Sequence, residues 1–220
     1  SIEAQTLIIA GYRGTTQITT ATAGGLLAVG STAEEVADLV NEKTPETGVT
    51  ANAITEAYIS MRNSGGFMAL STGSGLLTFD LAANDVVTRG SGGLLTGPST
   101  VEVSGQVTTT GDMSAVAESI NKLSGTTGIT ATLSQDKTFI KLTQDEGRDI
   151  DIQNANFFGA TAGTDVLTVR GATEEAYDLN GDLSTNFFTS TAGGGTAIRM
   201  VDQDTSLSTG TAIIAGRIEF

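Results

Sequence analysis

The feature that most constrains the fold of this chain is an internal repeat whose two copies lie 80 residues apart. The stretch Ala33–Asn41 resembles Met113–Asn121, and Thr47–Ala51 resembles Thr127–Ala131, without a gap in either pair. Self-similarity at a fixed spacing is the signature of a supersecondary unit that is built more than once. The chain is therefore expected to contain two related units.

The similarity continues on both sides of these blocks. Leu7–Gly11 corresponds to Val101–Gly105, with a longer loop in the first copy, and Ala57–Met61 corresponds to Thr138–Leu142 after a shift of one position. Four blocks in the same order are hard to attribute to chance. Each copy reads as strand, helix, strand, strand.

Both predicted helices carry apolar residues at positions i, i+3, i+4 and i+7, which lie on one face of a helix. These residues are Ala33, Val36, Ala37 and Val40 in the first copy and Met113, Val116, Ala117 and Ile120 in the second. Helices of about three turns need a surface to pack on. We therefore expect each helix to cover a sheet.

The ends of the two helices carry capping signals. Ser31 followed by Glu34 predicts a capping box at the first helix, and Pro45 helps to end that helical region. Asp112 is the expected N-cap of the second helix, and Gly125 is its expected exit.

Strands are predicted from alternation and turn residues. A strand begins after each helix, at Gly48–Ala51 and Gly128–Ala131, and a short polar turn follows it, at Thr55–Glu56 and Gln135–Lys137. Asp149–Gln153 alternates strictly, which predicts one face in water and the other in the core.

The remaining segments add strands without a helical period. Phe67–Leu70 is the expected counterpart of that alternating strand in the first copy, and Gly73–Thr100 is a connector with a strand at Leu76–Phe79. Residues 154–220 show short strands at Val166–Val169, Ala197–Met200 and Ala212–Ala215. The sequence leaves open whether this last segment forms its own sheet or completes one that begins at Leu7.

These elements predict an α+β, β-rich fold, with repeated units of a short helix packed on a small, mainly antiparallel sheet and an additional β-rich C-terminal segment. We expect two domains, residues 1–100 with the first copy and the connector, and residues 101–220 with the second copy and the β-rich tail. Composition agrees, because 28 Gly and few aromatic residues suit short strands joined by tight turns.

Charge and residue types exclude several functions. The net charge of −14 repels phosphate backbones and anionic membranes, so neither nucleic acid nor a membrane is an expected partner. The chain has no Cys and no His, which removes disulfides, thiolate nucleophiles, imidazole bases and most zinc or haem ligand sets. No apolar run reaches the roughly 20 residues that span a bilayer, and Ser1–Ala4 does not begin a signal peptide.

The candidate sites have simpler explanations. Asp178–Asp182 alternates oxygen ligands as a calcium loop does, but Leu183 and Thr189 stand where that loop needs Gly and Glu. A hairpin turn at Asn180–Gly181 is therefore preferred. The pairs Glu34–Glu35 and Glu174–Glu175 consist of adjacent residues, which do not face each other on a helix or strand.

Nucleophilic and sugar-stacking sites are equally weak. Without His, a serine nucleophile would need a lysine base, and the lysines considered for this role are expected in solvent; they are Lys43, Lys122 and Lys137. The chain has no Trp and few tyrosines to stack on a sugar ring, namely Tyr12, Tyr58 and Tyr177. The sequence predicts no catalytic residue, no cofactor and no metal site.

The repeat resembles a short motif from the central region of bacterial flagellins and hook-associated proteins. In that motif a strand ending in Gly precedes a helix with Val-Ala-x-x-Ile-Asn and then Thr-Gly-Val-Thr-Ala. The second copy carries it at Val116–Asn121 and Thr127–Ala131, and the first at Val36–Asn41 and Thr47–Ala51. The first copy departs from the pattern, with Val40 at the Ile position and a Pro-containing exit.

The resemblance implies a structural protein rather than an enzyme: the surface-exposed central part of a flagellin, outside the cell in the bacterial flagellum. Its partners would be other flagellin subunits, through terminal assembly helices that this sequence lacks. The fragment alone would be monomeric, with its first and last residues close together. The alternatives are a hook–filament junction protein, which uses the same motif, and a glycan-binding adhesin or phage-fibre module. Ser/Thr-rich loops would be the acceptors of any O-linked glycans.

Overall fold

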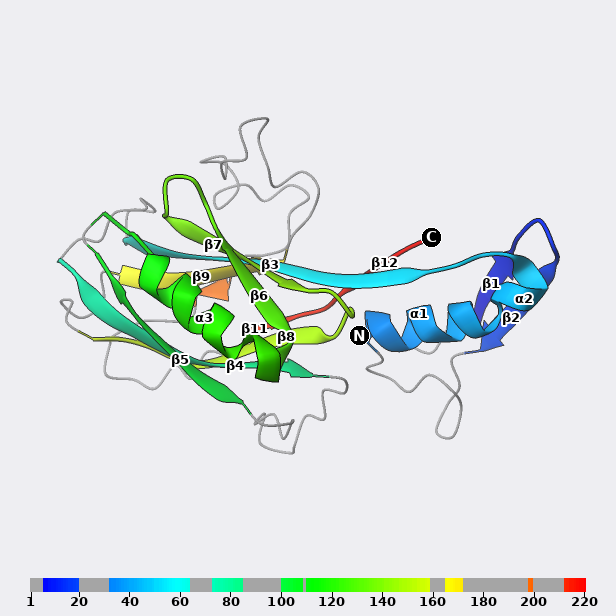
Figure 1. Cartoon of the computed structure of the whole chain (residues 1–220), viewed down its shortest axis with the longest axis horizontal. Coiled ribbons are helices and arrows are strands. Elements are labelled where there is room, and N and C mark those ends of the chain that lie inside the picture. Colours follow the sequence, from blue (N-terminus) through cyan, green and yellow to red (C-terminus); the bar gives the residue numbers. More distant parts are fainter. Residues whose placement is uncertain are drawn as a thin grey trace.

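The computed structural model describes residues 6–19, 32–63, 73–84, 100–108, 110–158, 165–171, 198–199 and 212–220. In these residues the chain forms three helices and twelve strands, and paired strands are antiparallel. Figure 1 shows an elongated molecule whose large lobe of sheets is joined to a small lobe by one long strand, β3 (Asn52–Asn63). The expected β-rich α+β fold with antiparallel sheets is confirmed.

The large lobe contains two sheets that share one core. The first has the strand order β10 (Ile198–Arg199), β9 (Asp165–Gly171), β3, β7 (Phe139–Gln144) and β6 (Ile129–Leu133), with β12 (Arg217–Glu219) also paired to β3. The second has the order β11 (Ala212–Ile214), β8 (Asp149–Phe158), β4 (Gly75–Asn84) and β5 (Val101–Val107). Strand pairing crosses the expected division at residue 100, because β4 pairs with both β5 and β8.

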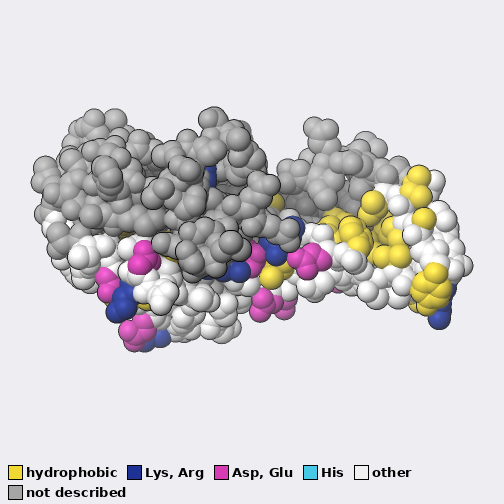
Figure 2. Space-filling view, turned by 90° about the horizontal axis from the view of Figure 1, so that it is seen from above, with side chains coloured by type: hydrophobic (Ala, Val, Ile, Leu, Met, Phe, Trp, Pro, Cys, Tyr) yellow, Lys and Arg dark blue, Asp and Glu magenta, His cyan; other side chains and the backbone are white. Residues whose placement is uncertain are grey.

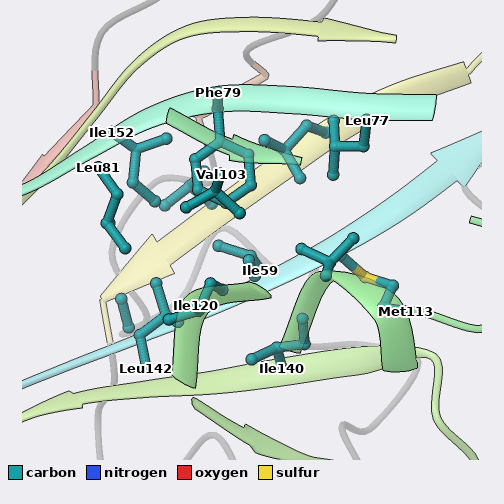
Figure 3. Packing of buried hydrophobic residues seen from close by; sticks show 14 of the residues in the cluster. Ile59, Leu77, Phe79, Leu81, Val103, Met113, Ile120, Ile140, Leu142 and Ile152 are labelled. Carbon is teal, nitrogen blue, oxygen red and sulfur yellow. The ribbon is translucent and has the colours of Figure 1, made fainter. Parts of the chain in front are cut away.

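The core between the two sheets comes from alternate residues of the central strands, since successive side chains of a strand point to opposite faces. Leu77, Phe79 and Leu81 on β4 are all buried. Figure 3 shows these side chains on one side of the core, with Ile59 of β3 and Ile140 of β7 on the other. The strand at Leu76–Phe79, expected within a connector, is therefore part of a central element.

Helix α3 (Ser114–Thr127) lies against both β5 and β6 and closes one side of this core. The predicted apolar stripe is buried, with Met113 just before the helix and Val116, Ala117 and Ile120 within it. Full burial of one such large apolar side chain contributes about 1.5–3 kcal/mol. The helix therefore lies against the end strands of two sheets, whereas it was expected to cover the face of one.

The small lobe consists of the hairpin of β1 (Thr6–Ala10) and β2 (Thr15–Thr19) and of two helices, α1 (Ala33–Glu42) and α2 (Thr44–Thr47). One apolar cluster holds it together, with Ile9, Ile18, Val36 and Val40 at its centre. Ile218 of β12 packs against the same cluster, so the strands nearest the two ends of the described chain meet there. The first helix thus buries its predicted face.

The two lobes meet where the first turn of α1 contacts the turn between β7 and β8. Arg148 in that turn donates two hydrogen bonds to the Glu34 carboxylate, at 3.0 Å from Nε and 3.4 Å from Nη2. A Cβ at Gly216 would lie 2.5 Å from Thr55 Oγ1 and 2.8 Å from Ala33 Cβ. Because only glycine fits such an approach, the junction is closely packed.

The capping box of the first helix lies one residue later than expected. Thr32 Oγ1 accepts the Glu35 N–H at 3.3 Å, and the Glu35 carboxylate accepts the Thr32 N–H at 3.2 Å. The local sequence offers two overlapping boxes, and burial of Ala33 as the first helical residue selects the second one. The prediction that Ser31 and Glu34 form the box is therefore wrong.

Pro45 divides the first helical region instead of ending it. Helix α1 stops at Glu42, and α2 begins at Thr44 with Pro45 in its first turn. Proline has no N–H to donate to the carbonyl four residues earlier, but it is tolerated at a helix start. The region as a whole ends at Gly48.

The second helix also departs from its predicted ends. Asp112 Oδ1 accepts the Ser114 N–H at 2.8 Å, as a capping side chain does, although Met113 is the N-cap residue. The helix continues past Gly125 and ends at Gly128, whose left-handed backbone forms the C-cap. A left-handed glycine at this position is a common helix terminator.

One strand and one turn predicted in the first copy are wrong. Gly48–Ala51 is not a strand, and Thr55–Glu56 is not a turn, because β3 runs without a break from Asn52 to Asn63. Pairing covers the whole of β3, first with β12 and then with β7 and β9. Two antiparallel strands therefore follow the second helix but not the first.

The alternation at the start of β8 does not produce a wet face. Asp149, Asp151 and Gln153 are as buried as the apolar residues between them. The backbone of Gly216 donates a hydrogen bond to Asp149, and Gln153 Nε2 donates to Asp151 Oδ2 at 2.5 Å. Polar side chains can be buried when hydrogen bonds compensate for lost water.

The described strands within residues 154–220 join the two sheets of the large lobe. The strands β9 and β10 extend the sheet of β3, β11 pairs with β8, and β12 pairs with β3. Within the described residues β1 pairs with β2 alone, so this segment joins no sheet that begins at Leu7. The strand predicted at Phe67–Leu70 lies outside the described residues.

Candidate functional site

The most distinctive local structure of the chain is the turn that connects α3 to β6. Asn121 Nδ2 donates to the Ala131 carbonyl at 2.9 Å, and the Ala131 N–H donates to Asn121 Oδ1 at 2.8 Å. One side-chain amide thus offers a donor and an acceptor to a single backbone residue, as a neighbouring strand would. This geometry ties Asn121, in the middle of α3, to the backbone of β6.

Thr127 and Gly128 shape the same turn. Thr127 Oγ1 donates to the Leu123 carbonyl at 3.2 Å and accepts the Ile129 N–H at 3.1 Å. Gly128 has a φ of 68°, and its N–H donates to the Ser124 carbonyl at 2.8 Å. Because residues with a Cβ disfavour this left-handed conformation, Thr-Gly suits a helix that passes directly into a strand.

Gly105 allows α3 to approach β5. A Cβ at this position would lie 2.5 Å from the Val116 nitrogen and 2.7 Å from its Cα, so a larger residue would push the helix off the strand. On the same strand the Ser104 N–H donates to Ser119 Oγ at 3.3 Å. The helix therefore contacts the outer edge of β5 as well as that of β6.

The same hydrogen bonds occur in the small lobe, 80 positions earlier. Asn41 and Ala51 exchange two hydrogen bonds of 2.9 Å each, and Thr47 Oγ1 accepts the Val49 N–H at 3.1 Å. Gly48 has a φ of 77°, and its N–H closes the end of α2. The two regions differ before the turn, where Pro45 interrupts the first helical region, and after it, where β3 replaces the two strands β6 and β7.

The loop between β1 and β2 forms a tip on the small lobe. Tyr12 is 82% exposed, and the Arg13 guanidinium lies 5.5 Å from the centroid of its ring, within range of a cation–π interaction. The Arg13 N–H donates to the Thr47 carbonyl at 3.2 Å, and the Tyr12 ring covers Gly48. Figure 2 shows hydrophobic side chains gathered over this lobe and charges of both signs over the large lobe.

The structure separates the candidate carboxylates Glu34 and Glu35. Glu34 binds Arg148 across the lobe junction, whereas Glu35 caps the backbone at the start of α1. A general acid and its partner base must both reach one reacting group. These two side chains are committed to different contacts, so they form no such couple.

The lysines considered as bases each contact a carboxylate; the pairs are Lys43–Glu46 at 3.5 Å, Lys122–Glu118 at 2.8 Å and Lys137–Asp112 at 3.7 Å. Sequence reasoning missed Lys141, which contacts Glu56 together with Arg217. Burial raises the pKa of Glu56, but hydrogen bonds from these two cations outweigh it and hold the pKa below its ordinary value. No local signal identifies this cluster, because its members come from β3, β7 and β12.

Asp149 is the most perturbed carboxyl group among the described residues. Burial raises its pKa to about 6, the charges of Asp151 and Glu35 act in the same direction, and the hydrogen bond from Gly216 opposes them. Its Oδ1 accepts no hydrogen bond from the described residues. The hydrogen bond from Gly216 places this group at the lobe junction.

The remaining candidates, Glu174–Glu175, Tyr177 and Asp178–Asp182, lie outside the described residues. In the described part of the chain, no three acidic side chains are arranged to hold a metal ion. None of the described helices combines the length and the apolar character needed to cross a membrane.

Residues 91–146 match the protein family described as the flagellin hook IN motif. The matched segment contains β5, α3, β6 and β7, and with them the Asn121–Ala131 turn and the glycine contact at Gly105. It covers less than half of the chain, and it supports a flagellin-like structural protein. No curated protein sequence matches the chain.

Proposed function

We propose that this chain is the surface-exposed central part of a bacterial flagellin, a structural component of the extracellular flagellar filament. The observation that carries the proposal is the match of residues 91–146 to the flagellin hook IN motif. The carboxylates of Glu34 and Glu56 form ion pairs, and the carboxyl group of Asp149 is buried and accepts a hydrogen bond from the Gly216 backbone. These contacts support a structural and non-enzymatic role.

The proposal includes a second copy of the motif in the small lobe. It is supported by the hydrogen bonds of Asn41 and Thr47, which reproduce those of Asn121 and Thr127, and by a left-handed glycine after each helix. The first copy has exchanged its two following strands for the single strand β3. The repeated unit is thus the helical region, the glycine that ends it and the residues up to Ala51 and Ala131.

The arrangement of β1 and β12 fits an outer domain. A domain that leaves a filament core and returns to it needs its entering and leaving strands close together. Ile9 of β1 and Ile218 of β12 belong to one apolar cluster in the small lobe. We therefore place the small lobe nearer to the filament core and the large lobe farther out, with subunit contacts made by terminal helices beyond this sequence.

The proposal is tested by removing residues 6–219 from the parent chain and joining the ends with a short Gly-Ser linker. Electron microscopy should show filaments that still assemble but have a smaller diameter. Antibodies against the large lobe should label wild-type filaments along the whole shaft and should not label the deleted form. A deletion that abolishes filaments, or leaves their diameter unchanged, would contradict the proposal.

The rival function is that of a hook–filament junction protein, since the matched family's description names the hook. Antibody labelling separates the two. If the chain belongs to a flagellin, the antibodies should label the whole shaft, which contains thousands of subunits. If it belongs to a junction protein, they should label only the place where the hook meets the filament.

In isolation the chain is expected to be a monomer, because a net charge of −14 opposes self-association. Light scattering over a range of protein concentrations measures this. A mass that grows with concentration for the unaltered chain would count against it.

A further inference from the structure

Three segments that are far apart in the sequence meet at the junction of the two lobes. The Glu34 N–H at the start of α1 donates to the Gly147 carbonyl, in the turn between β7 and β8, at 3.4 Å. A Cβ at Gly147 would overlap Ala53 of β3, and a Cβ at Gly216 would lie 2.8 Å from the Gly147 carbonyl oxygen. Because glycine has no Cβ, α1, this turn and the connection between β11 and β12 can approach one another closely.

A buried carboxyl group lies at this meeting point. Asp149 is the first residue of β8 and is 5% exposed. It accepts a hydrogen bond from the Gly216 backbone, and its Oδ1 accepts none from the described residues. Removing a carboxylate from water is unfavourable unless hydrogen bonds or an opposite charge compensate for it. A single backbone hydrogen bond does so only in part.

The groups around Asp149 favour its neutral form. Burial has the largest effect and raises its pKa to about 6; the charges of Asp151 and Glu35 act in the same direction, whereas the chain's amino terminus and the Gly216 N–H oppose them. On the neighbouring strand β4, its pairing partner is the uncharged Asn84. The arginines next to Asp149 and Gly216 bind other carboxylates; the pairs are Arg148–Glu34, Arg148–Glu146, Arg217–Glu56 and Arg217–Glu219.

We propose that the lobe junction is a proton-controlled hinge: with Asp149 protonated, the start of α1 stays docked on the turn between β7 and β8, and loss of this proton opens the contact. Opening brings water to the carboxylate and separates it from Glu35, so the charged form favours the open junction. Because β3 runs through the junction without a break, the angle between the lobes changes while their connection stays intact. The inference does not depend on the proposed function, because it concerns contacts within one chain.

The direction of the response to pH follows from the two states of Asp149. In the closed junction its pKa is about 6, whereas its ordinary value in water is 3.8. The closed form is therefore favoured most below about pH 4, and it loses this advantage as pH rises through 6. The difference between the two values allows the open-to-closed ratio to rise by up to about a hundredfold over this range.

The first test measures the distance between the lobes in the folded chain. The sequence has no Cys, so Glu42→Cys on α1 and Glu102→Cys on β5, both at exposed positions, can carry spin labels. In double electron–electron resonance, the open-to-closed ratio should be at least about tenfold larger at pH 7 than at pH 4.5. Protonation of Glu34 would weaken its pair with Arg148 and would broaden the distances at the lower pH, which is the opposite change.

The decisive variant is Asp149→Asn in the labelled chain, because Asn has nearly the shape of a protonated Asp and carries no charge. It should keep the closed distances at both pH values. The matched control is Asp145→Asn, which removes an exposed carboxylate from the same turn and should respond to pH as the parent does. Distances in the parent that do not change with pH would overturn the proposal. So would a response to pH that persists in Asp149→Asn.

Hydrogen exchange on the unaltered chain is the second test, and it does not depend on whether the variant folds. After correction for the intrinsic rate at each pH, protection of the Glu34 amide should fall at least about tenfold between pH 4.5 and pH 7. The amide of Ile59, in the large-lobe core, should stay better protected at both pH values, because the junction opens without unfolding the lobe. Equal protection of the two amides at pH 7 would show that only global unfolding exposes Glu34, and would overturn the proposal.

Discussion

Glu34 on α1 and Arg148 in the turn between β7 and β8 form a two-point ion pair across the lobe junction, although 114 residues separate them in the sequence. Both side chains keep partial contact with solvent, and Arg148 also contacts Glu146 at 3.2 Å. Partly exposed pairs of this kind contribute little free energy. We therefore expect the pair to act mainly by restricting the angle between the lobes.

The first prediction follows from this pair. Replacing Glu34 by Gln should lower the free energy of unfolding by only about 0.5–1 kcal/mol, because solvent screens the interaction. The spread of distances between spin labels placed on α1 and on β4 should increase clearly. The control is Glu46→Gln, which breaks a pair inside the small lobe and should leave that spread unchanged. An unaltered spread for Glu34→Gln would contradict the prediction.

The second prediction concerns the core beneath α3. Replacing the fully buried Ile120 by Asp should destabilise the fold by about 3–5 kcal/mol, because the core offers the carboxylate no partner. Ile120→Val keeps the shape and should cost about 1 kcal/mol. Urea unfolding followed by circular dichroism measures both. Similar losses for the two variants would show that the side chain is not buried in solution.

The third prediction compares the two left-handed glycines. Gly128→Ala should cost about 1–2 kcal/mol, because its φ of 68° is unfavourable for a residue with a Cβ, while the space beside it is open enough. Gly48→Ala should cost more, since the added Cβ would also overlap the Tyr12 ring. Removing that ring with Tyr12→Ala should recover the difference. Equal costs for the two glycine variants in thermal unfolding would rule out the Tyr12 contact.

The fourth prediction uses Asp149, whose pKa burial raises to about 6 from an ordinary value of 3.8. The folded state binds this proton more tightly than the unfolded state, so the group's contribution to stability falls as pH rises from about 4 to 6. Replacing Asp149 by Asn removes the ionisable group, and with it this loss of stability as pH rises. The variant should match the parent near pH 4 and exceed it by about 1–2 kcal/mol at pH 7, after allowance for solvent screening.

Urea unfolding at pH 4, 5, 6 and 7 measures this difference. Asp145→Asn is the matched control, because Asp145 is exposed in the nearby turn. A gain for Asp149→Asn that is as large at pH 4 as at pH 7 would mean that its origin is not the buried charge.

Local periodicity was enough to predict the helices and their buried faces. The stripes that contain Val36, Val40, Val116 and Ile120 are buried as expected, because the 3.6-residue period of a helix depends on neighbouring residues alone. The end of the second helix was less well predicted: the expected exit was Gly125 and a strand was expected from Gly128, whereas the turn lies at Thr127 and Gly128.

Features that depend on distant partners were not predictable. The polar residues Thr55 and Glu56 look like a turn, yet they lie inside β3 because β7 and β12 supply hydrogen bonds and counter-charges to them. Asp149 and Asp151 look solvent-facing, yet Gly216, more than 60 residues later, closes over the first of them. Neither register nor the return path of the C-terminal strands can be inferred from local pattern.

The unbroken course of β3 determines how the molecule bears a load. Its backbone is already extended at about 3.3 Å per residue, so it has almost no slack to give when the lobes are pulled apart. Pulling along it would place the hydrogen bonds to β7 and β9 in shear, and many would have to break together before the strand could slide. We therefore expect the link between the two lobes to be stiff. A force that pulls on one lobe should reach the other as tension along the backbone of β3.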